Sequence, residues 1–282
     1  MLNLRRYFPH LDKISSLPAV YNRITELIDD PNSSASDLGR VIEKDQALTA
    51  RLLQIANSAL WGLQKPVTTV ARAVSILGFK QLRELVLALS VRETFRSMGQ
   101  NSRITVRSFW EHSIACGIGS RILAIVQNLP NPETYFVAGF LHDIGQLLMI
   151  EHFPEKYAEV LERTHAGDRL AYEAEREIFG FGHDEVGGAL CHAWRLPPEF
   201  VDAILHHHRP AHVGRARSLA ATLHIADVLV HALQIGSSGT KLVPPLDKHA
   251  WAATGLQESL LETVVEKLLE QLQSTREFLL VN

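Results

Sequence analysis

The sequence Phe-Leu-His-Asp-Ile-Gly at residues 140–145 contains the most informative pair of side chains in the protein, His142 and Asp143. The pair interrupts the longest apolar run, Phe136 to Ile150, which is too short for the ~20 residues that span a bilayer. An imidazole nitrogen and a carboxylate oxygen are ligands that suit a divalent metal ion. The dipeptide alone is weak evidence, because helix surfaces often carry both residues. Thirteen of the fourteen histidines, however, lie at or after His112, which predicts a histidine-rich site in the C-terminal two thirds.

Length and composition indicate a globular protein with one large or two modest domains. The 282 residues are 46% hydrophobic, enough to fill a sizeable core. A formal net charge of −3 gives no general attraction to nucleic acid or to acidic membranes. Cys116 and Cys191 form no disulfide framework and are expected to be buried thiols of a reducing compartment. The first residues lack the apolar core of a signal peptide, so we expect a cytoplasmic protein.

Apolar residues recur at three and four positions throughout, and no sustained two-residue alternation is present. This periodicity predicts an all-α fold. Ser34 and Asp37 form a capping-box pattern, and Asp45 can cap the next helix. That helix has apolar residues at helical spacing, namely Leu48, Leu52, Ile55 and Ala56. A short helix from Val70 to Leu77 should end at Gly78, and another should run from Lys80 to Phe95.

A polar, glycine-containing stretch at 97–102 is the best candidate for a linker. It predicts an N-terminal helical subdomain at 1–100 and a histidine-rich helical subdomain at 101–282. Three of the expected helix starts carry proline in the first turn, at Pro132, Pro154 and Pro198. The helices predicted beyond the linker are 107–129, 132–151, 155–165, 169–179, 184–194, 198–207, 216–234 and 257–279.

The candidate metal ligands are imidazoles and carboxylates distributed over several of these helices. Asp227 lies in an apolar stretch where an unpaired carboxylate is costly to bury. Taken singly, each histidine is more simply explained as a core or solvated residue, and we interpret His192, His224 and His231 as structural. Jointly, the pattern favours one site. Its predicted members are His112, His142, Asp143, His183, His207, His208 and Asp227.

In a continuous 132–151 helix, neighbouring side chains point about 100° apart. His142 and Asp143 would then reach a cation only at the flank between them.

The order of these residues resembles the ligand order of the HD phosphohydrolase superfamily, especially its HD-GYP branch. The whole chain is similar to the HDOD family, the HD-related output domains of bacterial signalling proteins. The N-terminal segments that carry this resemblance are 17–20, 41–48, 55–58 and 73–78, and the C-terminal ones are 140–145, 183–187, 194–197 and 207–210. The resemblance implies an HD-domain-like helical bundle with an N-terminal helical subdomain. It also implies one or two divalent ions (Fe, Mn, Zn or Mg), with Asp143 as the bridging ligand if there are two.

The chain departs from the enzymes of the superfamily in three places. HD-GYP phosphodiesterases, which open cyclic di-GMP, carry a Gly-Tyr-Pro motif after the paired histidines, and that motif is absent here. Gln146 stands where those enzymes typically have lysine, and Ser108 where they often have glutamate. Losing a cation near the leaving phosphate removes electrostatic stabilisation of developing charge. Arg209 and Arg215 are the candidates for phosphate binding in its place.

Three functions fit the sequence to different degrees. The first is a signalling module with a metal-binding pocket that binds a protein partner or a nucleotide second messenger. The second is an active metal-dependent phosphohydrolase, in which a bound metal makes hydroxide from water. The third, nucleic-acid binding by a helix-turn-helix at 35–44 and 46–57, is weak, because Arg51 is the only basic residue of its second helix. We therefore favour the first function and expect neither nucleic acid nor membrane as a partner.

Overall fold

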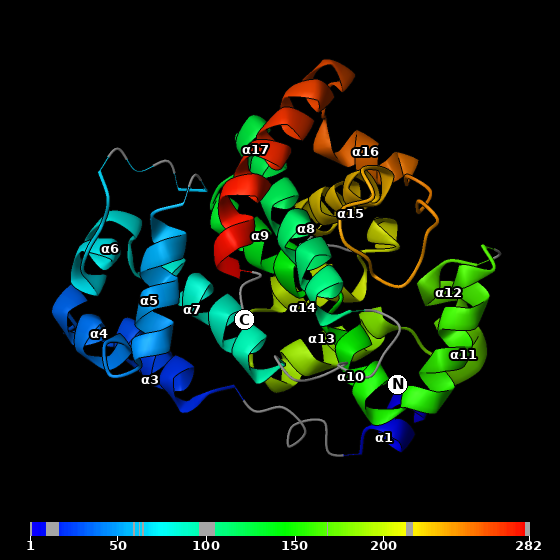
Figure 1. Cartoon of the computed structure of the whole chain (residues 1–282), viewed down its shortest axis with the longest axis horizontal. Coiled ribbons are helices and arrows are strands. Elements are labelled where there is room, and N and C mark those ends of the chain that lie inside the picture. The colour runs from blue at the N-terminus through cyan, green and yellow to red at the C-terminus, as the bar shows by residue number, and fades with distance from the viewer. Residues whose placement is uncertain are drawn as a thin grey trace. The chain divides into compact units, whose positions relative to one another are not determined.

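All the regular secondary structure in the described chain is helical. The computed structural model describes residues 2–9, 17–58, 60–61, 63, 65–95, 105–167, 169–212 and 217–279, and no strand occurs among them (Figure 1). The predicted all-α fold is therefore confirmed. Within the same residues, no helix combines the length and apolar character needed to cross a membrane.

The chain divides into two compact units. Unit 1 comprises Met1–Ser16 and Ser97–Val265, and unit 2 comprises Leu17–Arg96 and Glu266–Asn282. The predicted boundary near residue 100 stays a prediction, and the two units differ from its ranges at both ends of the chain. The predicted linker at 97–102 lies outside the described residues.

Unit 2 contains five short helices whose starts follow the sequence signals. They are α3 (Ala19–Asp29), α4 (Ala35–Ile42), α5 (Gln46–Ala56), α6 (Val70–Leu77) and α7 (Phe79–Thr94). The capping box of α4 forms as predicted, because the Asp37 backbone N–H donates to Ser34 and the Ser34 N–H donates back to Asp37. Asp45 caps α5, and α6 ends at Gly78 with a positive φ of 86°.

Unit 1 contains the histidine-rich helices, drawn in green to orange (Figure 1). They are α8 (Val106–Val126), α9 (Pro132–Leu141), α10 (Ile144–His152), α11 (Pro154–His165), α12 (Ala171–Phe179), α13 (His183–Ala193), α14 (Pro198–Leu205), α15 (Arg217–Ala232) and α16 (Lys248–Thr254). The short α1 (Leu2–Tyr7) also belongs to this unit, and α17 (Leu261–Leu279) passes from unit 1 into unit 2. Helix α8 packs on both α9 and α15, and α10 packs on α13.

The predicted helix 132–151 is wrong in one respect, because it is broken in two at the His-Asp pair. His142 is the residue after α9, and Asp143 precedes α10 with φ −96° and ψ 7°. The break lets both side chains face one site, whereas in a continuous helix they would reach a cation only at the flank between them.

Helix α10, which begins after the break, packs closely against α13. A Cβ atom on Gly145 would lie 2.1 Å from the His183 carbonyl oxygen, so the start of α10 is pressed against α13.

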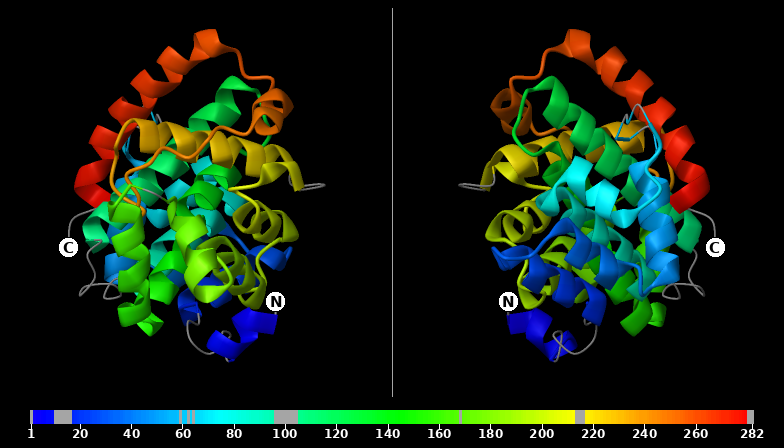
Figure 2. Two further views of the ribbon diagram at one scale, coloured as in Figure 1. Left: turned by 90° about the vertical axis from the view of Figure 1, so that its right-hand side faces the viewer. Right: turned by 90° about the vertical axis from the view of Figure 1, so that its left-hand side faces the viewer.

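Other helix boundaries also differ from the sequence predictions. Helix α14 ends at Leu205 instead of 207, which leaves His207 and His208 in the turn that follows. The predicted helix 257–279 begins with a 3-10 turn, Glu258–Leu260, before α17. Helix α16 was not predicted, and a long stretch without helix joins it to α15, visible as the orange tube in Figure 2.

Two glycines bring α8 and α9 together at the level of the site. A Cβ atom on Gly139 would lie 2.5 Å from the Cys116 carbonyl oxygen, and one on Gly117 would lie 2.8 Å from the Phe136 carbonyl oxygen. Only glycine therefore permits this approach of the two backbones. The approach places His112 beside His142, with ring centroids 5.4 Å apart.

Candidate metal centre

The seven predicted ligand side chains lie together inside unit 1. They come from five places in the fold: α8, the turn between α9 and α10, the first residue of α13, the turn after α14, and the middle of α15. Six of them are buried, and His208 is partly exposed. Their role as metal ligands stays a prediction, and their geometry divides them into two groups.

The first group is formed by His112, His142 and Asp227, with Cys116 beside them. The His112 Nε2 atom lies 3.2 Å from Asp227 Oδ1, and the His142 Nε2 atom lies 3.6 Å from the same oxygen. The Cys116 Sγ atom is 3.5 Å from His112 Nε2. Four potential donor atoms therefore surround one small volume.

The second group is formed by three imidazoles, His183, His207 and His208. The Nε2 atoms of His183 and His208 are only 2.9 Å apart. Two nitrogens bonded at about 2.0–2.1 Å to one ion at a right angle would be about 2.9 Å apart. The spacing thus suits two nitrogens that share an ion.

Asp143 lies between the two groups and presents one oxygen to each. Its Oδ2 atom is 3.1 Å from His142 Nε2 and 3.7 Å from His112 Nε2. Its Oδ1 atom is 3.1 Å from His183 Nε2 and 3.7 Å from His207 Nε2. A carboxylate in this position can bridge two ions or serve one from either side.

Backbone carbonyls hold two of the imidazoles in a form ready for coordination. His142 Nδ1 bonds to the Gly139 carbonyl oxygen at 2.7 Å, and His207 Nδ1 bonds to the Ile204 carbonyl oxygen at 2.7 Å. Because Nδ1 donates in each case, the Nε2 atom of the neutral ring has its lone pair free for a metal. Both Nε2 atoms are buried and make no hydrogen bond, although that of His142 lies 3.1 Å from Asp143 Oδ2. Buried polar atoms are rarely left in this state unless a water molecule or an ion satisfies them.

A buried glutamate orients His183 in the same way. Glu175 on α12 accepts hydrogen bonds from both His183 Nδ1 and the His183 backbone N–H, each at 2.7 Å. Its other oxygen accepts from the Tyr157 hydroxyl at 2.7 Å. A carboxylate behind a ligating imidazole is a common arrangement at metal sites, because it fixes the tautomer and raises the basicity of the free nitrogen.

The buried carboxylates make the site attractive to a cation. Burial lowers the pKa of His142, but the neighbouring Asp143 and Asp227 outweigh it and raise that pKa to about 10. Despite their burial, Asp143 and Asp227 have lowered pKa values because imidazoles surround them. By contrast, burial together with His142 and His183 lowers the pKa of His207 to about 4. Without metal, protonated imidazoles balance the two buried carboxylates, and a divalent ion that displaced those protons would supply the same positive charge.

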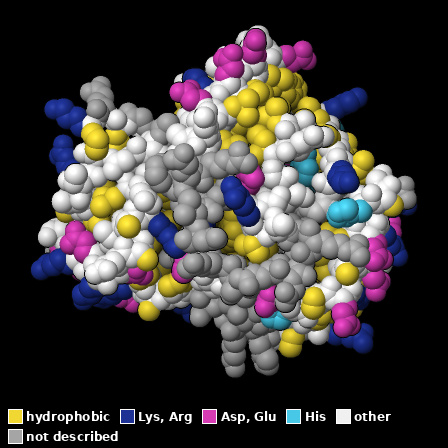
Figure 3. Space-filling view, viewed as in Figure 1, with side chains coloured by type: hydrophobic (Ala, Val, Ile, Leu, Met, Phe, Trp, Pro, Cys, Tyr) yellow, Lys and Arg dark blue, Asp and Glu magenta, His cyan; other side chains and the backbone are white. Residues whose placement is uncertain are grey.

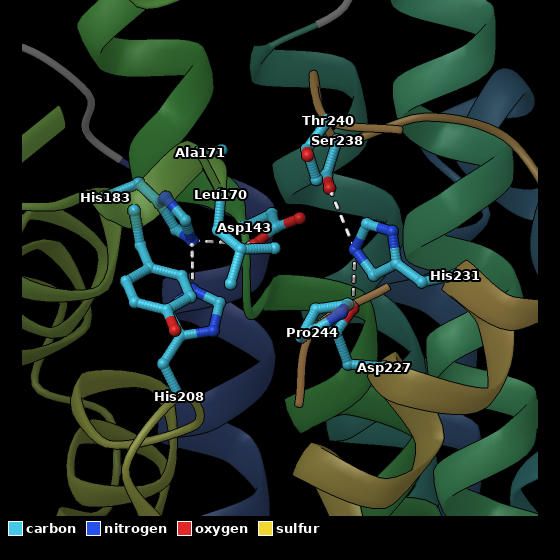
Figure 4. Close-up of a pocket in the computed structure, with 11 residues that line it drawn as sticks. Asp143, Leu170, Ala171, His183, His208, Asp227, His231, Ser238, Thr240 and Pro244 are labelled. Atoms are coloured by element: carbon cyan, nitrogen blue, oxygen red, sulfur yellow. Dashed lines mark hydrogen bonds and ion pairs between the residues drawn. The ribbon is translucent and has the colours of Figure 1, made fainter. Parts of the chain in front are cut away.

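A cavity of only about 10 Å³ lies beside the donors (Figure 4). The stretch after α15 lines one side of it with Ser238, Thr240 and Pro244, and Leu170 and Tyr172 line the other. Figure 4 shows His183 and His208 pointing toward each other on one side, and His231 facing Asp227 on the other.

Sequence reasoning missed three residues of this site. His231, interpreted as structural, lies one helical turn after Asp227 with its Nε2 atom 3.4 Å from Asp227 Oδ1. Cys116 was assigned only as a buried thiol, although its spacing of four residues from His112 could have indicated a shared helix face. Glu175 carries no local signal, because only the fold brings α12 behind His183.

Three residues considered for phosphate chemistry are placed differently. Gln146 is buried, and its amide N–H donates to the Ser238 carbonyl oxygen at 2.6 Å. This hydrogen bond holds the stretch after α15 in place, so the amide does not face an open pocket. Arg209 is exposed, one residue after His208. Arg215 lies outside the described residues.

Comparison with known proteins identifies the family of the chain. A family model for the HDOD domain matches residues 14–210. The chain belongs to the HDOD family. This HDOD chain is also 24% identical over 225 residues to an uncharacterized protein of Treponema pallidum (strain Nichols). That alignment covers 79% of this chain and 43% of the other, so the chain spans less than half the length of this curated relative.

Solved structures share the HDOD fold over almost the whole chain. An HDOD domain protein with unknown function from Geobacter sulfurreducens has a TM-score of 0.84 at 24% identity, covering 99% of this chain and 98% of that one. A protein from Shewanella amazonensis SB2B named "Putative phosphohydrolase" has a TM-score of 0.75 at 23% identity, covering 97% of each chain. At these identities the likeness establishes the fold, and the buried His, Asp and Cys cluster is compatible with a divalent metal.

Proposed function

We propose that this HDOD protein is a signalling module whose buried centre binds one or two divalent ions for a structural purpose. The observation that carries the proposal is a full set of ligand-type side chains around a cavity of about 10 Å³. A cavity of that size holds about one water molecule. The centre is thus equipped to hold metal and too small to admit a nucleotide.

The proposed ligands are the seven side chains predicted from the resemblance to HD enzymes. His112, His142 and Asp227 would hold one ion, and the second group of three imidazoles would hold another. Asp143 would serve both. When bound, the metal would supply positive charge to the two buried carboxylates and would join five separate segments of unit 1. Its loss should therefore lower the stability of unit 1.

The surroundings of the centre support a regulatory role more strongly than hydrolysis. The described residues that line the cavity include no lysine or arginine. A phosphodiesterase needs such a group, or a comparable donor, to neutralise charge on the leaving oxygen. Gln146, at the position of the usual lysine, is engaged with the backbone of Ser238. Hydrolysis remains the alternative proposal, with exposed Arg209 as its candidate phosphate ligand.

We propose a protein as the signalling partner, because the centre offers a nucleotide messenger no space. The lysine and arginine side chains on the face in Figure 3 are scattered among acidic ones, which does not favour nucleic acid. In the candidate helix-turn-helix, Arg51 pairs with Glu93 of α7, and Leu52 and Ile55 of α5 are buried. These contacts support a packed hairpin over a DNA-reading helix.

An anaerobic hydrolysis assay tests this proposal. The protein is supplied with Mn²⁺ or Fe²⁺ and offered nucleotides, generic phosphodiesters and cyclic dinucleotides, including cyclic di-GMP. We expect no turnover above the level of the Asp143→Ala variant. A rate above about 1 s⁻¹, within the ordinary enzyme range, that disappears in this variant would establish the hydrolase instead. Calorimetric titration with the same cyclic dinucleotides should show no binding, and binding would point to a nucleotide messenger.

A further inference from the structure

We infer that Cys116 is a thiolate ligand of the first donor group and that this group takes a thiophilic divalent ion such as Zn²⁺, Co²⁺ or Fe²⁺ in preference to Mg²⁺ or Mn²⁺. The inference rests on the proposed metal-binding function and specifies its chemistry. It adds a ligand to the predicted set and gives the first group the donors His112, Cys116, His142 and Asp227.

The placement of Cys116 follows from the helix that carries it. Cys116 lies four residues after His112 on α8, so the two side chains share one face of the helix. That face is buried, and the close approach of α9 at Gly139 covers it. The thiol and the imidazole are therefore presented together to Asp227 of α15.

Four of the six distances between donor atoms in the group lie near those expected of ligands that share one ion. Bonds of about 2.0–2.1 Å to nitrogen or oxygen and about 2.3 Å to sulfur place such ligands roughly 3.3–3.6 Å apart. The Cys116 Sγ atom is 3.5 Å from His112 Nε2 and 3.8 Å from Asp227 Oδ1. The Asp227 oxygen is 3.2 Å from His112 Nε2 and 3.6 Å from His142 Nε2.

A second observation comes from His142. Its ring is completely buried and its Nδ1 atom is engaged with the Gly139 carbonyl, while its Nε2 atom makes no hydrogen bond, although it lies 3.1 Å from Asp143 Oδ2 and 3.6 Å from Asp227 Oδ1. This nitrogen belongs to the same group of four donors as the Cys116 sulfur. A thiol hydrogen-bonded to Asp227 would explain the sulfur alone and would leave His142 Nε2 without a hydrogen bond.

The donor set decides the class of ion. Thiolate is a soft ligand that selects zinc and iron, and cobalt(II) commonly substitutes for zinc, whereas magnesium prefers a shell of oxygens. Two imidazoles, one thiolate and one carboxylate form a set suited to a borderline ion. On binding, the Cys116 thiol gives its proton to solvent and the sulfur lone pair forms the metal bond.

Cobalt titration of the metal-free 282-residue chain tests the inference, because a thiolate bound to Co²⁺ gives a near-ultraviolet charge-transfer band. The wild type should show that band together with the visible absorption of bound cobalt. Cys116→Ser and Cys116→Ala should lose the band and bind Zn²⁺ at least about tenfold more weakly. Cys191→Ser is the matched control: Cys191 is equally buried, belongs to none of the donor groups found among the described residues, and its variant should keep the band.

X-ray absorption of zinc-loaded Cys191→Ser protein provides a measurement that does not depend on the Cys116 variants folding. It should show a sulfur shell at about 2.3 Å. Bound cobalt with no charge-transfer band, or a zinc site without sulfur, would overturn the role of Cys116 and leave the proposed metal centre standing. Wild-type protein that retains no cobalt in equilibrium dialysis would overturn both.

Discussion

Glu175 is the residue on which the orientation of His183 depends. Its carboxylate is completely buried and accepts hydrogen bonds from the His183 ring, the His183 backbone and the Tyr157 hydroxyl. We predict that Glu175→Gln weakens metal binding by about 10–100-fold, because an amide is a poorer acceptor and does not fix the tautomer. Competition against a chromogenic chelator measures the change.

The control for this variant is Glu177→Gln on the same helix. Glu177 is exposed and pairs with Arg163 and Arg169 at the surface, where ion pairs contribute little. Its variant should bind metal like the wild type. Equal affinities for Glu175→Gln and Glu177→Gln would show that Glu175 does not support a ligand.

Asp37 gives unit 2 a stability contribution that depends on pH. Hydrogen bonds from the Ser34 side chain and backbone, and then from Arg40, lower the pKa of Asp37 to about 2 from 3.8. A lowered pKa in the folded state means that the stabilisation is present above pH 3.8 and is lost as the pH falls toward 2. Asp37→Asn should therefore be less stable than the wild type at pH 7, and the difference should shrink below about pH 4.

Denaturant unfolding of both proteins at several pH values measures this difference. A stability difference that stayed constant from pH 7 down to 3, or that grew as the pH fell, would contradict the role assigned to the Asp37 carboxylate.

At the scale of elements, the helix that follows the His-Asp break packs closely against α13. Gly145 has no space for a side chain, since a Cβ atom would lie 2.1 Å from the His183 carbonyl oxygen and 2.5 Å from the Gly187 nitrogen. We predict that Gly145→Ala lowers the free energy of unfolding by about 3 kcal/mol, because the two backbones must move apart. Denaturant unfolding measures the loss.

Gly39 in α4 serves as the comparison. A Cβ atom there would meet only Ala71, at ordinary contact distances of 3.5 Å and more. Gly39→Ala should be neutral or should stabilise the protein by about 0.5–1 kcal/mol, the usual gain of alanine over glycine within a helix. Gly145→Ala protein as stable as the wild type would mean that α10 and α13 can separate freely.

The helices of unit 2 could be predicted closely from the sequence, because their signals are local. The capping box at Ser34 forms as predicted, and the apolar residues expected on one face of the second helix are the buried ones, from Leu48 to Ala56. Helical periodicity, however, could not locate the break at His142, because the apolar pattern runs through it. The second helix begins beside a close contact with α13 at Gly145, and that contact is not visible in residues 132–151 alone.

At the scale of the whole molecule, the seven candidate ligands are separated by up to 115 residues, from His112 to Asp227, and converge only through the fold of unit 1. Their types and order could be found from the sequence, since each combines a ligand-type side chain with helical surroundings. Cys116, His231 and Glu175 could not be assigned to the site by the same reasoning. A buried thiol, a helical histidine and a helical glutamate are common in any protein, and only their contacts distinguish these three.

The segment that covers the candidate metal centre is also held in place only by the fold of unit 1. Gln146 and His231 both bond to Ser238, which holds the stretch after α15 against the cavity. From the sequence, Gln146 was interpreted as the replacement of a phosphate-binding lysine. In the structure its amide bonds to the Ser238 backbone and holds the stretch after α15 beside the candidate ligands.

Metal analysis of the 282-residue chain, purified without chelator and without a nickel affinity column, tests the central claim most directly. The account predicts one or two equivalents of divalent metal per chain in the wild type and far less in Asp143→Ala, together with a lower thermal midpoint for the variant, because binding to the native state stabilises it. Wild-type protein that retains no metal when offered Zn²⁺, Fe²⁺ or Mn²⁺, or Asp143→Ala protein that retains as much as the wild type, would contradict it.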